Sequence, residues 1–193
     1  MPANEPMQYS GVNHVALVAR DMAETVAFYT EVLEMPLVKT IDLPNGRGQH
    51  FFFDCGANSC IAFFWFPNAP AVAPGIASMH PDYATKGTAT AHASMNHLAI
   101  NIPLEKFDEY AERLRSRGIE VRVLNHGDGP DHATPNITPN TWIRSMYFRD
   151  PNGIHMELAA LTRAYHAGDV AHDPVDANGK RVSRNVREPA LQD

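Results

Sequence analysis

The sequence lacks several features that mark specialised classes of protein. Its 2 cysteines, Cys55 and Cys60, are too few for a disulfide framework and have no partners spaced for a zinc site. No apolar run approaches the roughly 20 residues that a membrane-spanning helix needs. The N-terminal segment has neither a basic start nor an apolar stretch, so we expect no signal peptide. We therefore expect a cytoplasmic protein without a membrane partner.

Basic residues are also in the minority. The chain of 193 residues has 16 Lys and Arg against 22 Asp and Glu, a formal net charge of −6. Such a chain is not expected to bind nucleic acid or anionic membranes as its main partner. The content of 44% hydrophobic and 20% charged residues is that of an ordinary globular protein, with room for one domain or two small modules that share a core.

What the sequence does contain is an internal repeat. Two segments, NHVALVARDMAETVAFY from Asn13 and NHLAINIPLEKFDEYAE from Asn96, begin with Asn-His, continue as a short strand and pass into a helical pattern. Asp21 is the expected N-cap of the first helix, with Glu24 completing a capping box, and Gly118 is the expected end of the second. Strand-like segments separated by turn signals follow each helix, so each half is predicted to be a β-α-β-β-β module.

The predicted fold is therefore α+β, built from two such modules. The expected divisions are an N-terminal arm, the first module, a connector rich in Pro and Ala, the second module and a polar tail, at residues 1–10, 11–66, 67–93, 94–161 and 162–193. A second irregular insert, residues 126–140, interrupts the second module. The connector and this insert are candidates for lids or rims over a site.

Two histidines and a glutamate interrupt predicted strands that are otherwise mostly apolar. Strand alternation places His14 and His97 on the less bulky faces of the first strands, and Glu157 on the equivalent face of the last strand. A single strand histidine is more often a hydrogen-bonded core residue. An ionised carboxylate in an apolar strand, however, is costly unless it is compensated. The repetition of Asn-His, together with Glu157, predicts a metal ion as the compensation.

These features resemble the vicinal oxygen chelate superfamily, which includes glyoxalase I, methylmalonyl-CoA epimerase, fosfomycin- and bleomycin-resistance proteins and type I extradiol dioxygenases. The resemblance covers residues 11–161. It implies that the two modules form a cup-shaped, partly open barrel around a metal ion bound by His14, His97 and Glu157. Relatives of the glyoxalase I type usually take a fourth ligand from the last strand of the first module, where this chain has Ala62.

A second resemblance, to extradiol ring-cleaving dioxygenases, lies in the segment YFRDPNGIHME at residues 147–157. It implies that Tyr147 hydrogen-bonds a substrate oxygen. Two histidines and one carboxylate leave metal positions open, an arrangement that suits Fe(II), with Mn(II), Zn(II) or Ni(II) as the other candidates. The histidine that the pattern places shortly before the tyrosine is absent, and His50 is our candidate acid/base in its place. The histidines assigned to loops are His80, His92, His126 and His132.

The predicted function is an iron-dependent dioxygenase for a catechol-like small molecule with adjacent oxygens, in a homodimer or higher homo-oligomer. Phe52 and Phe64 are expected to line an aromatic pocket. One alternative is a redox-neutral lyase or isomerase of the glyoxalase or epimerase type, which needs a strong base where Ala62 stands. Another is a non-catalytic drug-binding protein, a class that generally lacks metal ligands. Metal content would separate the last alternative from the enzymes, and oxygen uptake would separate the two enzymes.

Overall fold

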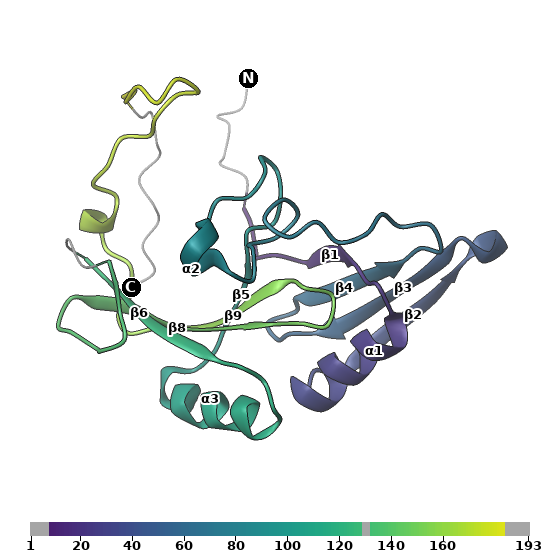
Figure 1. Ribbon diagram of the computed structural model, residues 1–193. Helices are drawn as coiled ribbons and strands as arrows, with labels where there is room; N and C mark the ends of the chain where they lie inside the picture. Colours follow the sequence, from purple (N-terminus) through teal and green to yellow (C-terminus); the bar gives the residue numbers. More distant parts are fainter. Residues whose placement is uncertain (1–7, 129–131, 184–193) are drawn as a thin grey trace.

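The computed structural model shows the two predicted β-α-β-β-β modules (Figure 1). It describes residues 8–128 and 132–183, so the start of the predicted arm and the end of the predicted tail lie outside the described residues. The first module contains β1 His14–Val18, α1 Met22–Ala27, a π-helical turn Phe28–Val32, β2 Leu37–Leu43, a 3-10 turn Pro44–Gly46, β3 Gly48–Asp54 and β4 Cys60–Trp65. The second contains β5 Leu98–Asn101, a 3-10 turn Leu104–Lys106, α3 Phe107–Ser116, β6 Arg122–Gly127, β7 Ala133–Thr134, β8 Thr141–Arg149 and β9 His155–Leu161.

Each module forms its own sheet, with the orders β1-β4-β3-β2 and β5-β9-β8-β6-β7. Within the described residues the sheets do not close into a barrel. Their registers are equivalent, because Ala16 pairs with Ala62 in the first sheet and Ala99 pairs with Glu157 in the second. Ala16 and Ala99 each lie two residues after the histidine of Asn-His. Ala62 and Glu157 therefore occupy the same position in their modules, as the sequence match predicted.

The helices begin and end close to their predicted positions. Asp21 is the N-cap of α1 and its carboxylate accepts the Glu24 N–H at 3.0 Å. The capping box is only half formed, because the Glu24 carboxylate binds Arg20 instead. Gly118, at φ +78°, adopts the left-handed conformation that ends a helix without a side-chain clash. Leu104 lies in the 3-10 turn before α3 and is 39% exposed.

Both α1 and α3 cover the same side of the two sheets (Figure 1). The strands contribute alternate apolar side chains to the layer between sheets and helices. The largest fully buried side chains there are those of Tyr29, Phe53, Phe63, Phe107, Ile61, Met146 and Met156. Burying one such side chain contributes roughly 1.5–3 kcal/mol. Because this layer occupies one face of each sheet, only the opposite face can carry a binding site.

The turn between β8 and β9 fastens one module to the other. Asp150 in this turn accepts a hydrogen bond from the Tyr29 hydroxyl at 3.3 Å, and both residues are buried. The Asn152 amide accepts the Arg20 N–H at 2.8 Å and donates to the Thr25 hydroxyl at 3.1 Å. Burial raises the pKa of Asp150. The Asp-Pro-Asn-Gly turn, which resembles a dioxygenase signature, thus also has a structural role at the start of α1.

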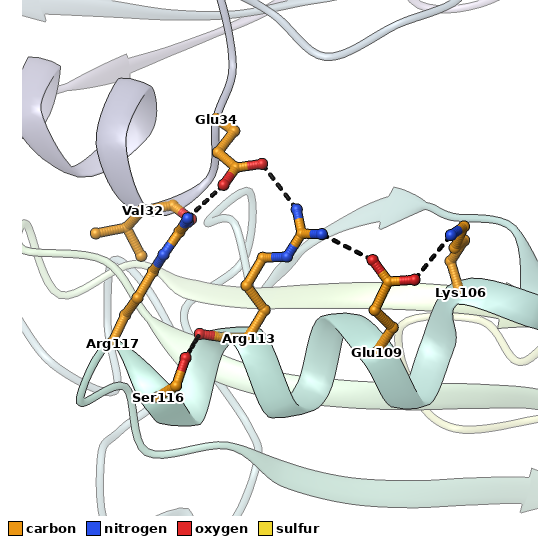
Figure 2. A network of polar contacts seen from close by, with 7 residues as sticks. All are labelled: Val32, Glu34, Lys106, Glu109, Arg113, Ser116 and Arg117. Carbon is orange, nitrogen blue, oxygen red and sulfur yellow. Dashed lines mark hydrogen bonds and ion pairs between the residues drawn. The ribbon is translucent and has the colours of Figure 1, made fainter.

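A chain of ion pairs makes a second contact between the modules (Figure 2). Glu34, just after the π-helical turn, binds Arg113 at 2.8 Å and also Arg117, both in or next to α3. The chain continues along α3 through Glu109 to Lys106. Exposed pairs contribute only about 0–1 kcal/mol each, but a connected network restricts orientation more than isolated pairs do.

The connector crosses the sheet face that α1 and α3 leave uncovered, and carries the short helix α2 Tyr83–Lys86 (Figure 1). Its Met79 carbonyl accepts a hydrogen bond from Arg149 at 2.9 Å. Its Ser78 hydroxyl accepts the His155 N–H at 3.1 Å. Two contacts thus hold the connector on the rim of the second sheet.

Arg163 connects the described part of the tail to the end of β6. Arg163 binds Asp169 in the 3-10 turn Ala167–Asp169 at 2.6 Å, and Asp128 after β6 at 2.9 Å. Across residues 8–128 and 132–183, no helix has the length and apolar character needed to cross a bilayer.

Candidate metal centre

One face of the second sheet gathers three of the side chains predicted to have a function, those of His97, Tyr147 and Glu157. His155 and Glu157 of β9 share this face. Tyr147 of β8 pairs with Glu157, and Arg149 pairs with His155. His97, immediately before β5, reaches the same face. The face is the one turned away from α3 and toward the connector, so it is free to bind a ligand.

Glu157 and His97 form the centre of this face. The Glu157 side chain is 6% exposed, and its Oε2 lies 3.0 Å from His97 Nε2. Ser145 donates its hydroxyl to the other carboxylate oxygen at 2.5 Å. Burial by itself raises the pKa of Glu157, but the hydrogen bonds from His97 and Ser145 outweigh it and hold that pKa below its usual value. Glu157 in turn raises the pKa of His97 through their hydrogen bond.

An asparagine orients the ring of each repeated histidine. The Asn13 amide oxygen lies 2.7 Å from His14 Nδ1, and the Asn96 amide oxygen lies 3.0 Å from His97 Nδ1. The Asn96 amide is itself fixed, because its nitrogen donates to the Thr88 carbonyl at 2.7 Å. An amide oxygen only accepts, so Nδ1 of each ring carries a hydrogen, and a metal bound at Nε2 of His97 would displace the hydrogen that this atom gives to Glu157. A metal-binding histidine usually donates the N–H of its other ring nitrogen to an acceptor of this kind, which fixes the orientation of the ring.

His14 lies apart from the other two predicted ligands. It is exposed at the start of β1, on the first sheet, with its ring 5.6 Å from that of Phe52. Across residues 8–128 and 132–183, no group of three His, Cys, Asp or Glu side chains is arranged to hold a metal ion. The structure therefore brings His97 and Glu157 together and leaves His14 on a separate face.

His50, the predicted acid/base, also belongs to the first sheet. Its ring stacks on Phe64 with a centroid distance of 3.6 Å, and Phe52 lies next to it at 4.3 Å. Its Nε2 is buried, with no hydrogen-bond partner in the described part of the chain. Burial, followed by the nearby His14, lowers the pKa of His50. Its catalytic role stays a prediction.

The histidine beside Tyr147 is His126, whose Nε2 lies 2.9 Å from the tyrosine hydroxyl. The assignment of His126 to a loop was wrong, because pairing with β8 extends β6 to Gly127. Alternation along RVLNHG would have placed it on the same face as Arg122, the cross-strand partner of Tyr147. Burial, and then the charge of Glu157, raises the pKa of Tyr147 to about 12, so this hydroxyl stays protonated at neutral pH.

His155 is buried in the same face and does not lie at its rim. It is 3% exposed and stacks on Tyr147 with a centroid distance of 5.3 Å. Tyr83 of α2 covers it edge-on. Burial, and then the positive charge of Arg149, lowers the pKa of His155 to about 4, so the ring is neutral.

Comparison with known proteins identifies the family of the chain. The family model of the Glyoxalase/Bleomycin resistance protein/Dioxygenase superfamily matches residues 11–158. The chain belongs to this superfamily. The resemblance to the vicinal oxygen chelate proteins, predicted from the repeat and the motifs, is thereby confirmed, as is the fold class.

Individual relatives of this superfamily member are distant. The fosfomycin resistance protein FosX of Listeria innocua is 25% identical over 158 residues, which cover 79% of this chain and 91% of the relative. A glyoxalase family protein from Enterococcus faecalis has a similar structure, with a TM-score of 0.56, 22% identity and coverage of 79% and 99%. FosX from Listeria monocytogenes, solved with Mn(II) and sulfate, has a TM-score of 0.50, 22% identity and coverage of 80% and 95%.

Proposed function

We propose that the protein is a metal-dependent enzyme whose site is completed between two copies of the chain. His97 and Glu157 of one copy and His14 of the other are the proposed ligands. The observation that carries this proposal is the shared ring orientation, since both histidines have Nδ1 fixed by the preceding asparagine and are exposed. A closed two-fold dimer would contain two such sites.

The donor atoms suit a divalent metal. Glu157 is a buried carboxylate whose one ion-pair partner in the described residues is His97, and a bound cation would compensate its charge. Imidazole and carboxylate donors without thiolate suit Fe(II), Mn(II), Zn(II) and Ni(II). When bound, such a metal supplies positive charge that lowers the pKa of substrate hydroxyls, and Fe(II) also supplies the redox chemistry that O2 requires.

Tyr147 and His126 would handle the proton beside this metal. Because the Tyr147 hydroxyl keeps its proton, it can donate a hydrogen bond to a substrate oxygen. His126 is only half-buried and can exchange a proton between the Tyr147 oxygen and solvent through its Nε2. In this role His126 would replace the histidine that the dioxygenase pattern places shortly before the tyrosine. His155, neutral and stacked on Tyr147, keeps the phenol ring in place.

The reaction we propose is oxidative ring cleavage of a catechol-like substrate with Fe(II) and O2. Ala62 occupies the position equivalent to Glu157 in the first sheet and cannot bind metal, which leaves a ligand set of two histidines and one carboxylate. The first sheet also presents the stacked His50, Phe52 and Phe64 on the face that carries His14. In the proposed dimer this aromatic surface would contact a planar substrate.

A second candidate is the addition of water or another small nucleophile to an oxygen-containing ring. The curated relatives favour it, because both FosX proteins confer fosfomycin resistance by their names and are 25% and 26% identical to this chain. The same Tyr147 hydroxyl could then protonate an oxygen released by the opened ring.

One experiment separates these candidates. The full-length protein would be purified without oxygen, its metal content measured, and oxygen uptake followed with catechol and with hydroxyquinol. We expect one divalent metal per chain and oxygen uptake only after Fe(II) loading. Loss of fosfomycin without oxygen uptake, under the same conditions with Mn(II), would replace the dioxygenase proposal with the second candidate. Absence of metal would leave only a binding protein.

Replacement of Tyr147 by phenylalanine tests the proton donor. The substitution removes one hydroxyl and keeps the stacked ring, so metal content and unfolding temperature should stay the same. A lost hydrogen bond to a charged oxygen costs about 1.5–3 kcal/mol, so kcat/KM should fall on the order of ten- to a hundredfold. Tyr110→Phe, at a half-buried tyrosine of α3 away from the polar face, is the control. Full activity in the Tyr147 variant would show that this residue serves packing only.

A further inference from the structure

A cavity of about 560 Å³ lies at the end of the polar face, next to the proposed metal ligands. Tyr83 of α2 covers it from the connector side, and Arg122, Tyr147, Arg149 and His155 line it. These strand residues share one face of the second sheet, because Arg122 pairs with Tyr147 and Arg149 pairs with His155. Tyr147 therefore borders both the cavity and the space beside His97, whose ring lies 6.1 Å away.

Arg149 brings a positive charge into this cavity, and the carboxylates of Asp150 and Asp82 act on it without forming an ion pair. Its guanidinium donates to the Gly153 and Met79 carbonyls, at 3.0 and 2.9 Å, and forms no ion pair within the described chain. A guanidinium has five N–H donors, so these bonds leave donors for a ligand. The charge is half-buried and has no direct ion-pair partner in the described residues, so a bound anion would offset part of its desolvation cost.

Arg122 adds a second cation at the mouth of the cavity. Its guanidinium lies over the Tyr83 ring, 5.0 Å from the centroid, and it too has no carboxylate partner among residues 8–128 and 132–183. Stacking on an aromatic face leaves the edge of the guanidinium, with its donors, free for a planar or tetrahedral oxyanion. The two arginines thus flank Tyr147 from β6 and from the end of β8.

A third group in the cavity is unsatisfied. His155 is 3% exposed, and its Nδ1 is buried without a hydrogen-bond partner in the described residues. Two carboxylates, Asp82 and Glu120, also line the cavity, but both are exposed and surrounded by solvent. Their repulsion of an anion is screened by water and salt to a greater degree than the attraction of the half-buried Arg149.

We propose that this cavity binds an oxyanion of the substrate, a carboxylate or a phosphonate, through Arg122 and Arg149. The inference rests on the proposed function, because it assumes that one substrate reaches from the metal ligands, past Tyr147, into this cavity. The substrate would then be a molecule with two adjacent oxygens at one end and an acidic group at the other. Such a group would fix which end of the substrate faces the metal.

The test measures binding of small probes to the metal-loaded full-length protein by calorimetry. Benzoate and phenylphosphonate carry the two kinds of oxyanion, and benzamide is the neutral control of the same shape. We expect an oxyanion to bind about tenfold or more tightly than benzamide, as a charge-assisted hydrogen bond predicts. The tighter of the two acids identifies the kind of group.

Arg122→Gln should remove most of this preference, and Arg115→Gln, an exposed arginine of α3, should leave it unchanged. Arg122→Lys, which keeps the charge, should retain part of it. Circular dichroism and metal content should match wild type in all three variants. Equal affinity for benzoate and benzamide, or a benzoate affinity that Arg122→Gln does not change, would overturn the proposal. Oxygen uptake with catechol does not depend on this outcome, so the two proposals fail separately.

Discussion

Alanine in place of Glu157 should abolish stable metal binding. The variant loses the only carboxylate among the proposed ligands and leaves His97 without its partner at 3.0 Å. Loss of an outer-shell partner already weakens metal binding 10- to 100-fold, so loss of a ligand should weaken it by roughly 100-fold or more. Metal content measured after gel filtration should fall to background, together with any metal-dependent activity. His14→Ala and His97→Ala should behave in the same way.

Two controls make this result specific. Glu120→Ala removes an exposed carboxylate at the cavity rim and should retain the metal. Glu157→Gln, which keeps the shape of the side chain and an acceptor for Ser145, should also lose the metal while its metal-free unfolding temperature stays close to that of metal-free wild type. Wild-type metal content in all three ligand variants would refute the assignment.

Mixing two inactive variants should restore metal binding if the site lies between copies. A chain with His14→Ala still offers His97 and Glu157, and a chain with Glu157→Ala still offers His14. After unfolding and refolding together, random pairing makes half of the dimers mixed, and each mixed dimer has one intact site of two. Metal content should therefore recover to about one quarter of the wild-type value.

The same mixture also tests the alternative of a site within one chain. In that case each variant would keep its own defect, and mixing would restore no metal. His97→Ala mixed with Glu157→Ala is the matched control, because both ligands come from the same sheet. That mixture should stay without metal whichever arrangement is correct.

The repeat made much of the fold predictable. Asn-His twice, followed by strand and helix periods, identified both modules, and equivalent alternation matched Ala62 to Glu157 before the strand registers were known. Local rules suffice here because strand faces and helix caps depend on residues near each other in the sequence. Local rules failed for the capping box, because the Glu24 side chain pairs with Arg20, four residues earlier, and does not bind the backbone of Asp21.

The site was less predictable, because its parts come from segments that only the fold brings together. His126 was missed because the end of β6 is set by pairing with β8, and the local sequence there reads as a loop. The buried state of His155 depends on Tyr83, which the connector brings over it. The separation of His14 from His97 and Glu157 follows from the contact between modules, which no pattern within one module encodes.

The turn at residues 150–153 has one more consequence. Because Asp150 and Asn152 of the second repeat are satisfied by side chains and backbone at the start of the first, the joint between the repeats is directional. The first repeat has no matching Asp-Pro-Asn-Gly turn to offer in return. A duplicated ancestor with identical halves would lack this asymmetry. The contact therefore depends on a turn that only the second repeat supplies, and a chain built from two copies of the first repeat would lose these hydrogen bonds.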